Sequence, residues 1–337
     1  MTAKESKNKT QLIDRFGRKV SYLRMSATDR CDLRCVYCMS EDMTFVPREQ
    51  LLTLEEMIRI GTTAVDLGVN KIRITGGEPL TRTGIISVFQ ALGKLEGLDD
   101  LTITTNGTQL ERFAQPLKDA GVTRINISLD TLQKDRFKEL TRNGKIEKTL
   151  SGIDAAIKAN FKAIKLNTVI LKNRNDDEIL DLIQYVEERG IDISFIEEMP
   201  LGVITEHDRA ESYYSSEQIK ADIRQQHSLI RSSDKTGGPS RYYQLNQGSS
   251  RVGFISPHSH NFCDSCNRVR LTAEGRLLLC LGQEHSVDLR RVVRANPLDD
   301  TPLRHALIQS MDIKPKGHEF ILDEQPLIFR HMSSTGG

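Results

Sequence analysis

Six short segments in the first 200 residues read as strands, and at least four of them alternate apolar and polar side chains, the pattern of strands whose two faces meet different surroundings. These segments are residues 20–27, 71–76, 101–106, 124–130, 162–170 and 193–199. Amphipathic stretches separate them, and the first such helix is predicted to begin at the capping box Thr53-Leu-Glu-Glu56. Strand-then-helix units in succession predict a parallel α/β sheet.

The alternation also indicates what kind of sheet this is. Ile72 and Ile74 alternate with Lys71, Arg73 and Thr75, and three further segments repeat the pattern. The strands of a packed barrel are apolar on both faces, so a polar face predicts an open barrel that lines a cavity. Because the alternation stops near residues 215–226, a partial (β/α)6 TIM-type barrel fits better than an eight-unit one.

Basic side chains fall on the polar face. Arg24, Arg73 and Lys165 are each predicted to point into the cavity. Three cations on one inferred face favour an anionic ligand.

The pattern changes beyond residue 200. Residues 242–245, 251–255 and 268–281 read as antiparallel strands, the last a hairpin that turns at Glu274-Gly275. Two helical runs follow. We therefore predict a disordered lead-in at 1–14, a barrel at 15–226, and a β-rich and helical C-terminal domain at 227–337 that closes the barrel and ends in a Gly-Gly tail.

Composition limits the partners and the compartment. Lysine and arginine (47) nearly balance aspartate and glutamate (46), so the bulk charge predicts neither a nucleic-acid nor a membrane role. No apolar run approaches the roughly 20 residues of a membrane span, and the start of the chain lacks the apolar core of a signal peptide. Six cysteines without a secretion signal indicate a reducing compartment, and we expect a cytoplasmic protein.

Three cysteines, Cys31, Cys35 and Cys38, follow the first predicted strand at C-x3-C-x2-C spacing. Three thiolates this close can hold one iron–sulfur cluster and leave one iron open for a ligand. A zinc knuckle that lacks a ligand, or three unrelated thiols, are the alternatives. The spacing favours the cluster.

A second triad consists of Cys263, Cys266 and Cys280. Taken alone it favours zinc, which His258 or His260 would complete. The repeat of an incomplete three-cysteine set reverses this preference and favours a second cluster. Arg268 and Arg270 lie just beyond Cys266 and would share one strand face, as an anion clamp or as a solvated edge.

Other signals are weaker. Gly76-Gly77-Glu78-Pro79 can bring the backbone close to a ligand or can be a plain turn, and Thr104-Thr105-Asn106-Gly107 reads as an ordinary turn. The remaining histidines show no spacing and are expected on the surface or in the core: His207, His227, His285, His305, His318 and His331.

Together these residues resemble the radical S-adenosylmethionine enzymes, and nearly end to end the chain is similar to the GTP 3′,8-cyclase family. The matching stretches are Leu23-Arg24-Met-Ser26-Ala-Thr28-Asp29-Arg-Cys31, Arg73-Ile-Thr75-Gly-Gly77-Glu78-Pro79, Thr104-Thr105-Asn106-Gly107, Asn126-Ile-Ser128-Leu-Asp130, Lys165-Leu-Asn167-Thr168-Val169, Phe195-Ile-Glu197-Glu-Met199, Cys263-Asp-Ser-Cys266-Asn267-Arg268-Val-Arg270-Leu and the terminal Gly-Gly. Each falls where the family has it in the barrel.

The resemblance implies two 4Fe-4S clusters, one on each triad, with S-adenosylmethionine on the open iron of the first. It implies the following residue roles. Tyr37, Gly77, Ser128 and Met199 would line the S-adenosylmethionine pocket. Arg24, Arg73, Thr104, Lys165, Arg268, Val269 and Arg270 would hold GTP, whose guanine would meet the second cluster. The tail residues Gly336 and Gly337 would reach toward the active site.

The implied activity is that of a lyase in molybdenum cofactor biosynthesis. A 5′-deoxyadenosyl radical would take the ribose 3′ hydrogen of GTP, and C3′ would then bond to C8. The resemblance also implies an external electron donor and a homodimer. Two departures from the family are Ser194, where an arginine is frequent, and Thr335, where a branched aliphatic residue is frequent.

Two alternatives stay open at this point. One is another radical S-adenosylmethionine enzyme with an auxiliary cluster, such as a peptide-modifying one, although those usually carry more cysteines. The other is a zinc-binding interaction protein.

Overall fold

The computed structural model describes residues 11–40, 42–202, 204, 207–234, 236–245, 248–318, 320, 328 and 330–336. The first ten residues of the predicted lead-in, and Gly337 of the predicted tail, lie outside this part of the chain.

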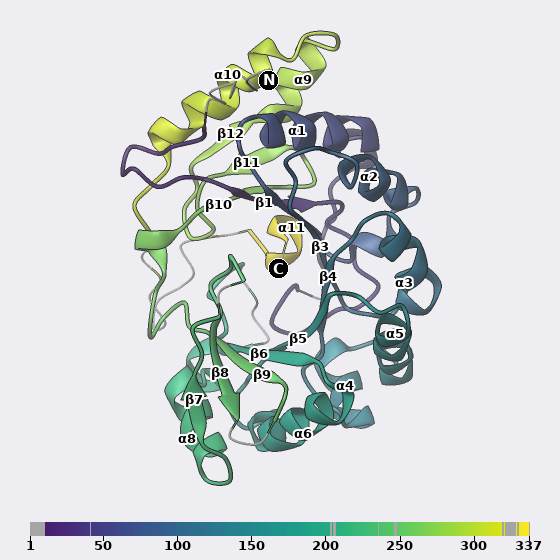
Figure 1. The fold of residues 1–337 in the computed structure, drawn as a ribbon, viewed down its shortest axis with the longest axis vertical. Coiled ribbons are helices and arrows are strands. Elements are labelled where there is room, and N and C mark those ends of the chain that lie inside the picture. Colours follow the sequence, from purple (N-terminus) through teal and green to yellow (C-terminus); the bar gives the residue numbers. More distant parts are fainter. Residues whose placement is uncertain are drawn as a thin grey trace, which may run out of the picture.

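Six parallel strands form the centre of the fold (Figure 1). They are β1 (Tyr22–Ser26), β2 (Lys71–Thr75), β3 (Asp100–Thr105), β4 (Arg124–Ser128), β5 (Ala163–Val169) and β6 (Asp192–Ile196). Each pairs in parallel with the next. The sheet runs β12-β11-β10-β1-β2-β3-β4-β5-β6-β9-β8-β7 and does not close, which confirms the predicted partial barrel with a C-terminal extension.

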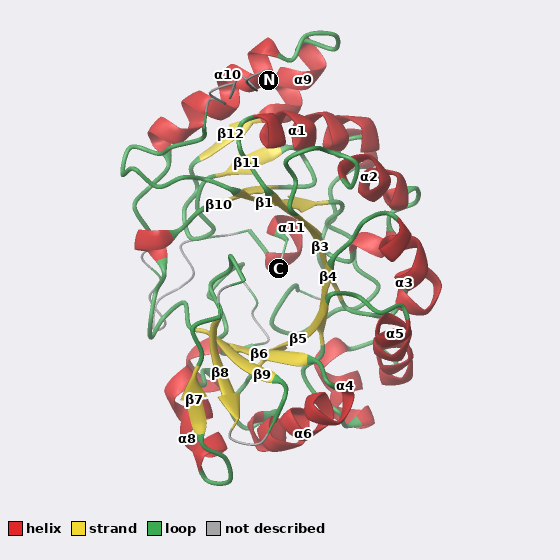
Figure 2. Ribbon diagram, viewed as in Figure 1, coloured by secondary structure: helices red, strands yellow, loops and turns green. Residues whose placement is uncertain are grey.

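Helices cover the outer face of this sheet (Figure 2). They are α1 (Leu54–Asp66), α2 (Ile85–Leu92), α3 (Leu110–Asp119), α4 (Lys134–Thr141), α5 (Ile146–Lys158) and α6 (Ile179–Arg189). The predicted capping box opens α1: the Glu56 amide donates to Thr53 Oγ1 (3.1 Å), and the Thr53 amide donates to Glu56 Oε2 (2.8 Å). Ile72, Ile74 and Ile125 are fully buried in the apolar layer under these helices, which leaves the polar alternates for the inner face.

The later strands extend the sheet at both ends. They are β7 (Leu229–Arg231), β8 (Arg241–Leu245), β9 (Arg251–Ile255), β10 (Arg268–Leu271), β11 (Arg276–Leu278) and β12 (Ser286–Asp288). The predicted hairpin is confirmed, since β10 and β11 are antiparallel around Gly275. The expectation of purely antiparallel strands is wrong, because β9 lies parallel to β6 and β10 parallel to β1. Local sequence carries no information on the direction of such distant partners.

Short helices complete the described chain. The α-helices are α7 (Arg209–Ser212), α8 (Ser216–Arg224), α9 (Leu289–Ala295), α10 (Thr301–Gln309) and α11 (Met332–Thr335). The 3₁₀ turns are η1 (Arg48–Gln50), η2 (Pro79–Thr81), η3 (Asp176–Glu178), η4 (Cys263–Ser265) and η5 (Ser310–Ile313). Among the described residues, none of these helices combines the length and the apolar character needed to cross a bilayer.

The last described segment lies inside the barrel rather than on its surface. Helix α11 stands between β1 and the loops that follow β6 (Figure 1). The Gly336 carbonyl accepts hydrogen bonds from Arg24 Nη2 (3.2 Å) and from Arg270 Nη1. The tail therefore touches the polar lining of the barrel.

Candidate active site

Two adjoining cavities open on the polar face of the sheet. The first cavity is lined by every residue predicted for the first cluster and its cosubstrate: Cys31, Cys35, Cys38, Tyr37, Gly77, Ser128 and Met199. The second cavity is lined by the second triad and four of the predicted GTP residues: Cys263, Cys266, Cys280, Arg24, Arg268, Val269 and Arg270. Asn167 and Met199 line both, so the two cavities meet at these side chains.

The other predicted GTP residues lie on or beside the lining. Thr104 lines the first cavity. Arg73 is buried and donates through Nη1 to Thr104 Oγ1 (3.2 Å), and Lys165 donates to the Tyr242 hydroxyl (3.2 Å). Of the predicted tail, Gly336 contacts Arg24 and Arg270, and Gly337 lies outside the described residues.

The Gly-Gly-Glu turn after β2 packs on the chain just before the first triad. The Gly77 amide donates to the Thr28 carbonyl (2.7 Å), and the Glu78 amide donates to the Arg30 carbonyl (2.8 Å). A Cβ at Gly76 would lie 2.4 Å from the Thr28 carbonyl oxygen, so only glycine allows this approach. The turn fixes the position of the cysteine loop.

Carboxyl groups lie behind the lining of the first cavity and around the first triad. Glu78 is fully buried and accepts hydrogen bonds from the amides of Leu80 (3.0 Å) and Asn106 (2.7 Å). Burial raises the pKa of Glu78 to about 8. Asp130 accepts from the Tyr37 hydroxyl (2.7 Å), and burial raises the pKa of Asp130 to about 6.

Amide and hydroxyl groups tie a third carboxylate to the first triad. Asn106 Nδ2 donates to Asp32 Oδ1 (2.7 Å) and lies 3.7 Å from the Cys31 sulfur, and the Thr108 hydroxyl donates to Asp32 Oδ2 (2.6 Å). Burial, followed by the charges of Glu78 and Asp32, raises the pKa of the Cys31 thiol. Acidic neighbours thus dominate this end of the barrel.

Cations surround the second cavity. The sheet register places Arg24 beside Arg270 on β10 and beside Arg73 on β2, which makes a row of three guanidinium groups across the inner face. Burial, then repulsion from Arg24 and Arg268, lowers the pKa of Arg270 well below its usual range. Positive charges this close to one another and away from water favour the binding of an anion.

A buried lysine that the sequence did not single out supports the second triad. Lys314 is 1 % exposed, and its Nζ donates to the carbonyls of Leu279 (2.6 Å) and Arg268 (3.1 Å). The same Nζ lies 4.0 Å from the Cys266 sulfur. Burial would raise the pKa of Cys266, but Lys314 and neighbouring arginines hold it below its usual value. The sequence could not single out Lys314, because the carbonyls it binds lie 35 and 46 residues away along the chain.

Two buried tyrosines face the cations. Arg73 Nε donates to the Tyr22 hydroxyl (2.7 Å), and the Lys71 ammonium lies 5.2 Å from the centre of the Tyr22 ring. Burial acts to raise the pKa of Tyr22, but the charges of Arg73, Arg24, Lys71 and Arg268 outweigh it and lower the pKa to about 7. In the same way, Lys165 and other partners lower the pKa of Tyr242 to about 8 against the effect of burial. The strand alternation could have revealed Tyr22, which shares a face with Arg24.

Ser194, which the sequence analysis set apart from the family pattern, is fully buried. Its hydroxyl lies 2.9 Å from the Ser240 hydroxyl, and a Cβ on Gly253 would lie 2.6 Å from Ser194 Oγ. This packing leaves no room for an arginine side chain without rearrangement. A neutral hydroxyl pair therefore occupies this position.

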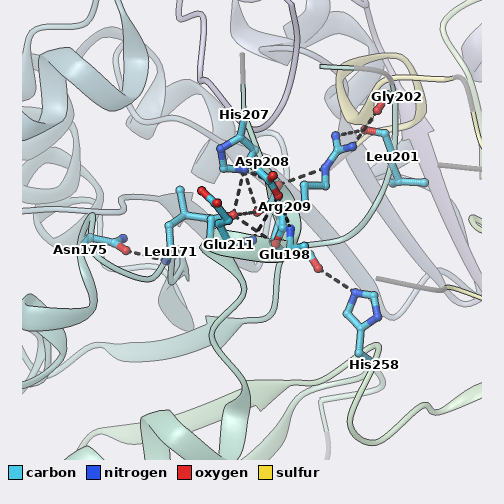
Figure 3. A network of polar contacts seen from close by, with 12 residues as sticks. Leu171, Asn175, Glu198, Leu201, Gly202, His207, Asp208, Arg209, Glu211 and His258 are labelled. Carbon is cyan, nitrogen blue, oxygen red and sulfur yellow. Dashed lines mark hydrogen bonds and ion pairs between the residues drawn. The ribbon is translucent and has the colours of Figure 1, made fainter. Parts of the chain in front are cut away.

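A network around Glu198 holds the chain next to Met199 (Figure 3). The buried Glu198 carboxylate accepts from His207 Nε2 (2.8 Å), from Arg209 Nε (3.2 Å) and from the Ser212 hydroxyl (3.0 Å). His258 Nε2 donates to the Glu198 carbonyl (2.9 Å). No motif or spacing in the sequence indicates this network, because its members are separated by an irregular loop.

Arg209 extends the network to the next turn of the chain. Its two terminal nitrogens donate to the carbonyls of Gly202 (2.9 Å) and Leu201 (2.5 Å). Glu198, Met199 and Leu201 all line the first cavity. The network thus fixes one wall of that cavity.

The residues of both triads fit iron–sulfur clusters. All six cysteines are free thiols, and three line each cavity. Cysteine thiolates spread around a cavity suit a larger cluster.

Two protein-family models match successive parts of this chain. The Radical SAM superfamily model matches residues 25–186, and the Molybdenum Cofactor Synthesis C model matches residues 191–320. The crystal structure of Streptococcus suis SuiB bound to S-adenosylmethionine covers 94% of this chain and 78% of its own, with a TM-score of 0.61 at 18% identity, a likeness of fold. Fold and cysteine loop thus define a radical S-adenosylmethionine protein.

Relatives with higher sequence identity show which family within this class the chain belongs to. A protein named GTP 3′,8-cyclase from Ectopseudomonas mendocina (strain ymp) is 56% identical over 97% of this chain and 99% of its own length. One of the same name from Saccharophagus degradans (strain 2-40 / ATCC 43961 / DSM 17024) is 56% identical over 97% and 98%. This chain belongs to the GTP 3′,8-cyclase family.

Proposed function

We propose that this chain catalyses the GTP 3′,8-cyclase reaction, with S-adenosylmethionine in the first cavity and GTP in the second. The observation that carries the proposal is the adjoining pair of cavities, one acidic with a cysteine triad and one basic with another. Met199 and Asn167 border both, so ligands in the two cavities would approach each other there. Holding two reactants in contact is the protein's main contribution when a cosubstrate carries the chemistry.

The first cavity would hold the cosubstrate. Cys31, Cys35 and Cys38 would ligate a 4Fe-4S cluster, and Tyr37, Gly77, Ser128 and Met199 would line the pocket around S-adenosylmethionine. When bound and reduced, this pair would supply a 5′-deoxyadenosyl radical, which would take the ribose 3′ hydrogen of GTP. Glu197 and Glu198, which line this cavity, suit a cosubstrate that carries a sulfonium and an ammonium group.

The second cavity would hold GTP. The row of Arg24, Arg73 and Arg270, with Arg268 beside it, supplies charge-assisted hydrogen bonds for the triphosphate. Cys263, Cys266 and Cys280 would hold a second 4Fe-4S cluster near the guanine. With the base and phosphates held, the C3′ radical would bond to C8, and one electron from the external donor with one proton from solvent would complete 3′,8-cyclo-7,8-dihydro-GTP. An external electron donor and a homodimer complete the proposal.

The relatives' names favour this reaction over peptide modification. A likeness of 18% identity to SuiB concerns the fold alone, whereas 56% identity along almost the whole chain links it to GTP 3′,8-cyclases.

Anaerobic assay of the reconstituted protein tests the proposal. Incubation with reductant, S-adenosylmethionine and GTP is expected to form 5′-deoxyadenosine together with loss of GTP, and omission of GTP should greatly reduce it. Equal cleavage of S-adenosylmethionine with and without GTP would contradict the assignment. A colourless protein that binds zinc without iron or sulfide would defeat the whole enzyme reading.

A further inference from the structure

One wall of the second cavity carries a histidine that no part of the proposed reaction uses. His318 lines this cavity together with the three cysteines of the second triad. A Cβ on its neighbour Gly317 would lie 3.1 Å from the Cys263 sulfur, so the chain at this point touches the triad.

The polar atoms of this imidazole have no partner among the described residues. Both His318 ring nitrogens are buried without a hydrogen bond to any of them. Buried polar groups in native proteins are nearly always hydrogen-bonded, so a ring at a cavity wall whose nitrogens lack partners indicates a place where a bound ligand, reached by a half-turn of the ring in its own plane, would supply them. The ring plane is fixed by stacking, with the Phe320 ring centre 4.1 Å away and the planes 30° apart.

The charge of the ring separates its role from that of the arginines. Burial, and then repulsion from His258, lowers the pKa of His318 to about 4, so the imidazole is neutral near pH 7. A neutral imidazole offers one donor and one acceptor, which adds little to the binding of phosphates but matches the mixed edge of a nucleobase. Phe262, Leu281 and Phe320 line the cavity beside it and provide apolar surface for a flat ring.

We propose that His318 hydrogen-bonds the guanine base of the substrate in the second cavity. The proposal rests on the proposed function and assigns it a further residue: the arginines hold the phosphates and His318 holds the base. The competing role for this imidazole is a fourth protein ligand of the second cluster. If His318 binds the base, its replacement removes a hydrogen bond to the nucleotide. If it is a cluster ligand, its replacement removes iron.

His318→Phe tests the proposal, because it keeps the aromatic stack on Phe320 and removes only the nitrogens. Equilibrium binding is measured anaerobically on the full-length reconstituted protein with two probes, GTP and inorganic tripolyphosphate. We expect the affinity for GTP to fall about tenfold, because one hydrogen bond between the base and the ring is lost and nothing replaces it. The affinity for tripolyphosphate and the iron content should not change. His305→Phe, on the exposed face of α10, serves as the matched control and should change nothing. His318→Asn should restore part of the GTP affinity.

Three results would overturn the proposal: unchanged GTP affinity, equal loss of affinity for both probes, or loss of about four iron atoms per chain, which would make His318 a cluster ligand. Wild-type protein that holds both clusters and cleaves S-adenosylmethionine yet binds no GTP would instead overturn the proposed function, and the base contact with it.

Discussion

The two cysteine triads look alike in sequence, but the structure places them in opposite electrostatic surroundings. Glu78, Asp130 and Asp32 stand around the first triad, where burial and acidic neighbours raise the pKa of Cys31. Lys314 and a set of arginines stand around the second, where they lower the pKa of Cys266.

This difference matches the two proposed ligands. Buried charges are costly unless an opposite charge meets them, so each cavity favours one kind of ligand and rejects the other. The acidic cavity suits the cationic cosubstrate, and the basic cavity suits a triphosphate. Charge thus assigns each reactant to its own side of Met199, where both cavities meet.

Cysteine replacement should give the largest effect and separate the two cavities. Cys35→Ser is expected to abolish 5′-deoxyadenosine formation, because the cosubstrate loses its site. Cys266→Ser should abolish GTP conversion while the first cluster and S-adenosylmethionine binding persist. Each variant should lose about four iron atoms per chain, measured by iron and sulfide analysis. Retained cosubstrate cleavage in Cys35→Ser would refute the placement of the first cluster.

Loss of one arginine should weaken only the anion side. Arg268→Ala or Arg270→Ala is expected to lower the affinity for GTP about 10- to 100-fold, since each removes charge-assisted hydrogen bonds. Iron content and S-adenosylmethionine affinity should match the wild type, as binding titrations would reveal. Arg241→Ala, on an exposed position of β8, is the control. Loss of iron in either variant would mean that the arginine supports the triad instead.

Disruption of the Glu198 network should act on the cosubstrate side. Glu198→Ala leaves Arg209 and His207 buried without their carboxylate, which is expected to lower the free energy of unfolding by about 3 kcal/mol. The affinity for S-adenosylmethionine should also fall, whereas tripolyphosphate binding should not. Chemical denaturation and titration measure these changes, with the exposed Glu188→Ala as the control. Equal loss for both ligands would show a general structural defect.

The smallest effect concerns pH and the basic cavity. The pKa of Tyr22 is lowered to about 7 in the folded protein from 10 in the unfolded chain. Between these values the unfolded chain binds more protons, so the Tyr22 contribution to stability grows as pH rises and is lost as pH falls through 7. Relative to Tyr22→Phe, substrate-free wild type should gain about 1.5 kcal/mol between pH 7 and pH 8.5, measured by anaerobic denaturation. Equal slopes for the two proteins would remove Tyr22 as a counter-charge.

Much of the fold and both triads could be predicted from the sequence because their signals are local. Short strand-like runs revealed β1 to β6, the two-residue alternation in β2 to β5 revealed a polar face, and cysteine spacing marked both triads. The parallel pairing of β10 with β1 could not be predicted, because it joins strands at opposite ends of the chain. The same reason hid Lys314 and the Glu198 network, whose partners meet only in the folded protein. His318 was expected on the surface or in the core, and only the folded structure shows that it lines the second cavity with the second triad.

The pairing of β1 with β10 has a consequence for how the protein is made. The first cavity draws most of its lining from residues 31–201, and the arginine row draws on β1, β2 and β10. During synthesis, β1 emerges early and must wait for β10 to leave the ribosome before that edge of the sheet is paired. The anion site is therefore completed late, so the growing chain can shape its cosubstrate pocket before any place for the nucleotide exists.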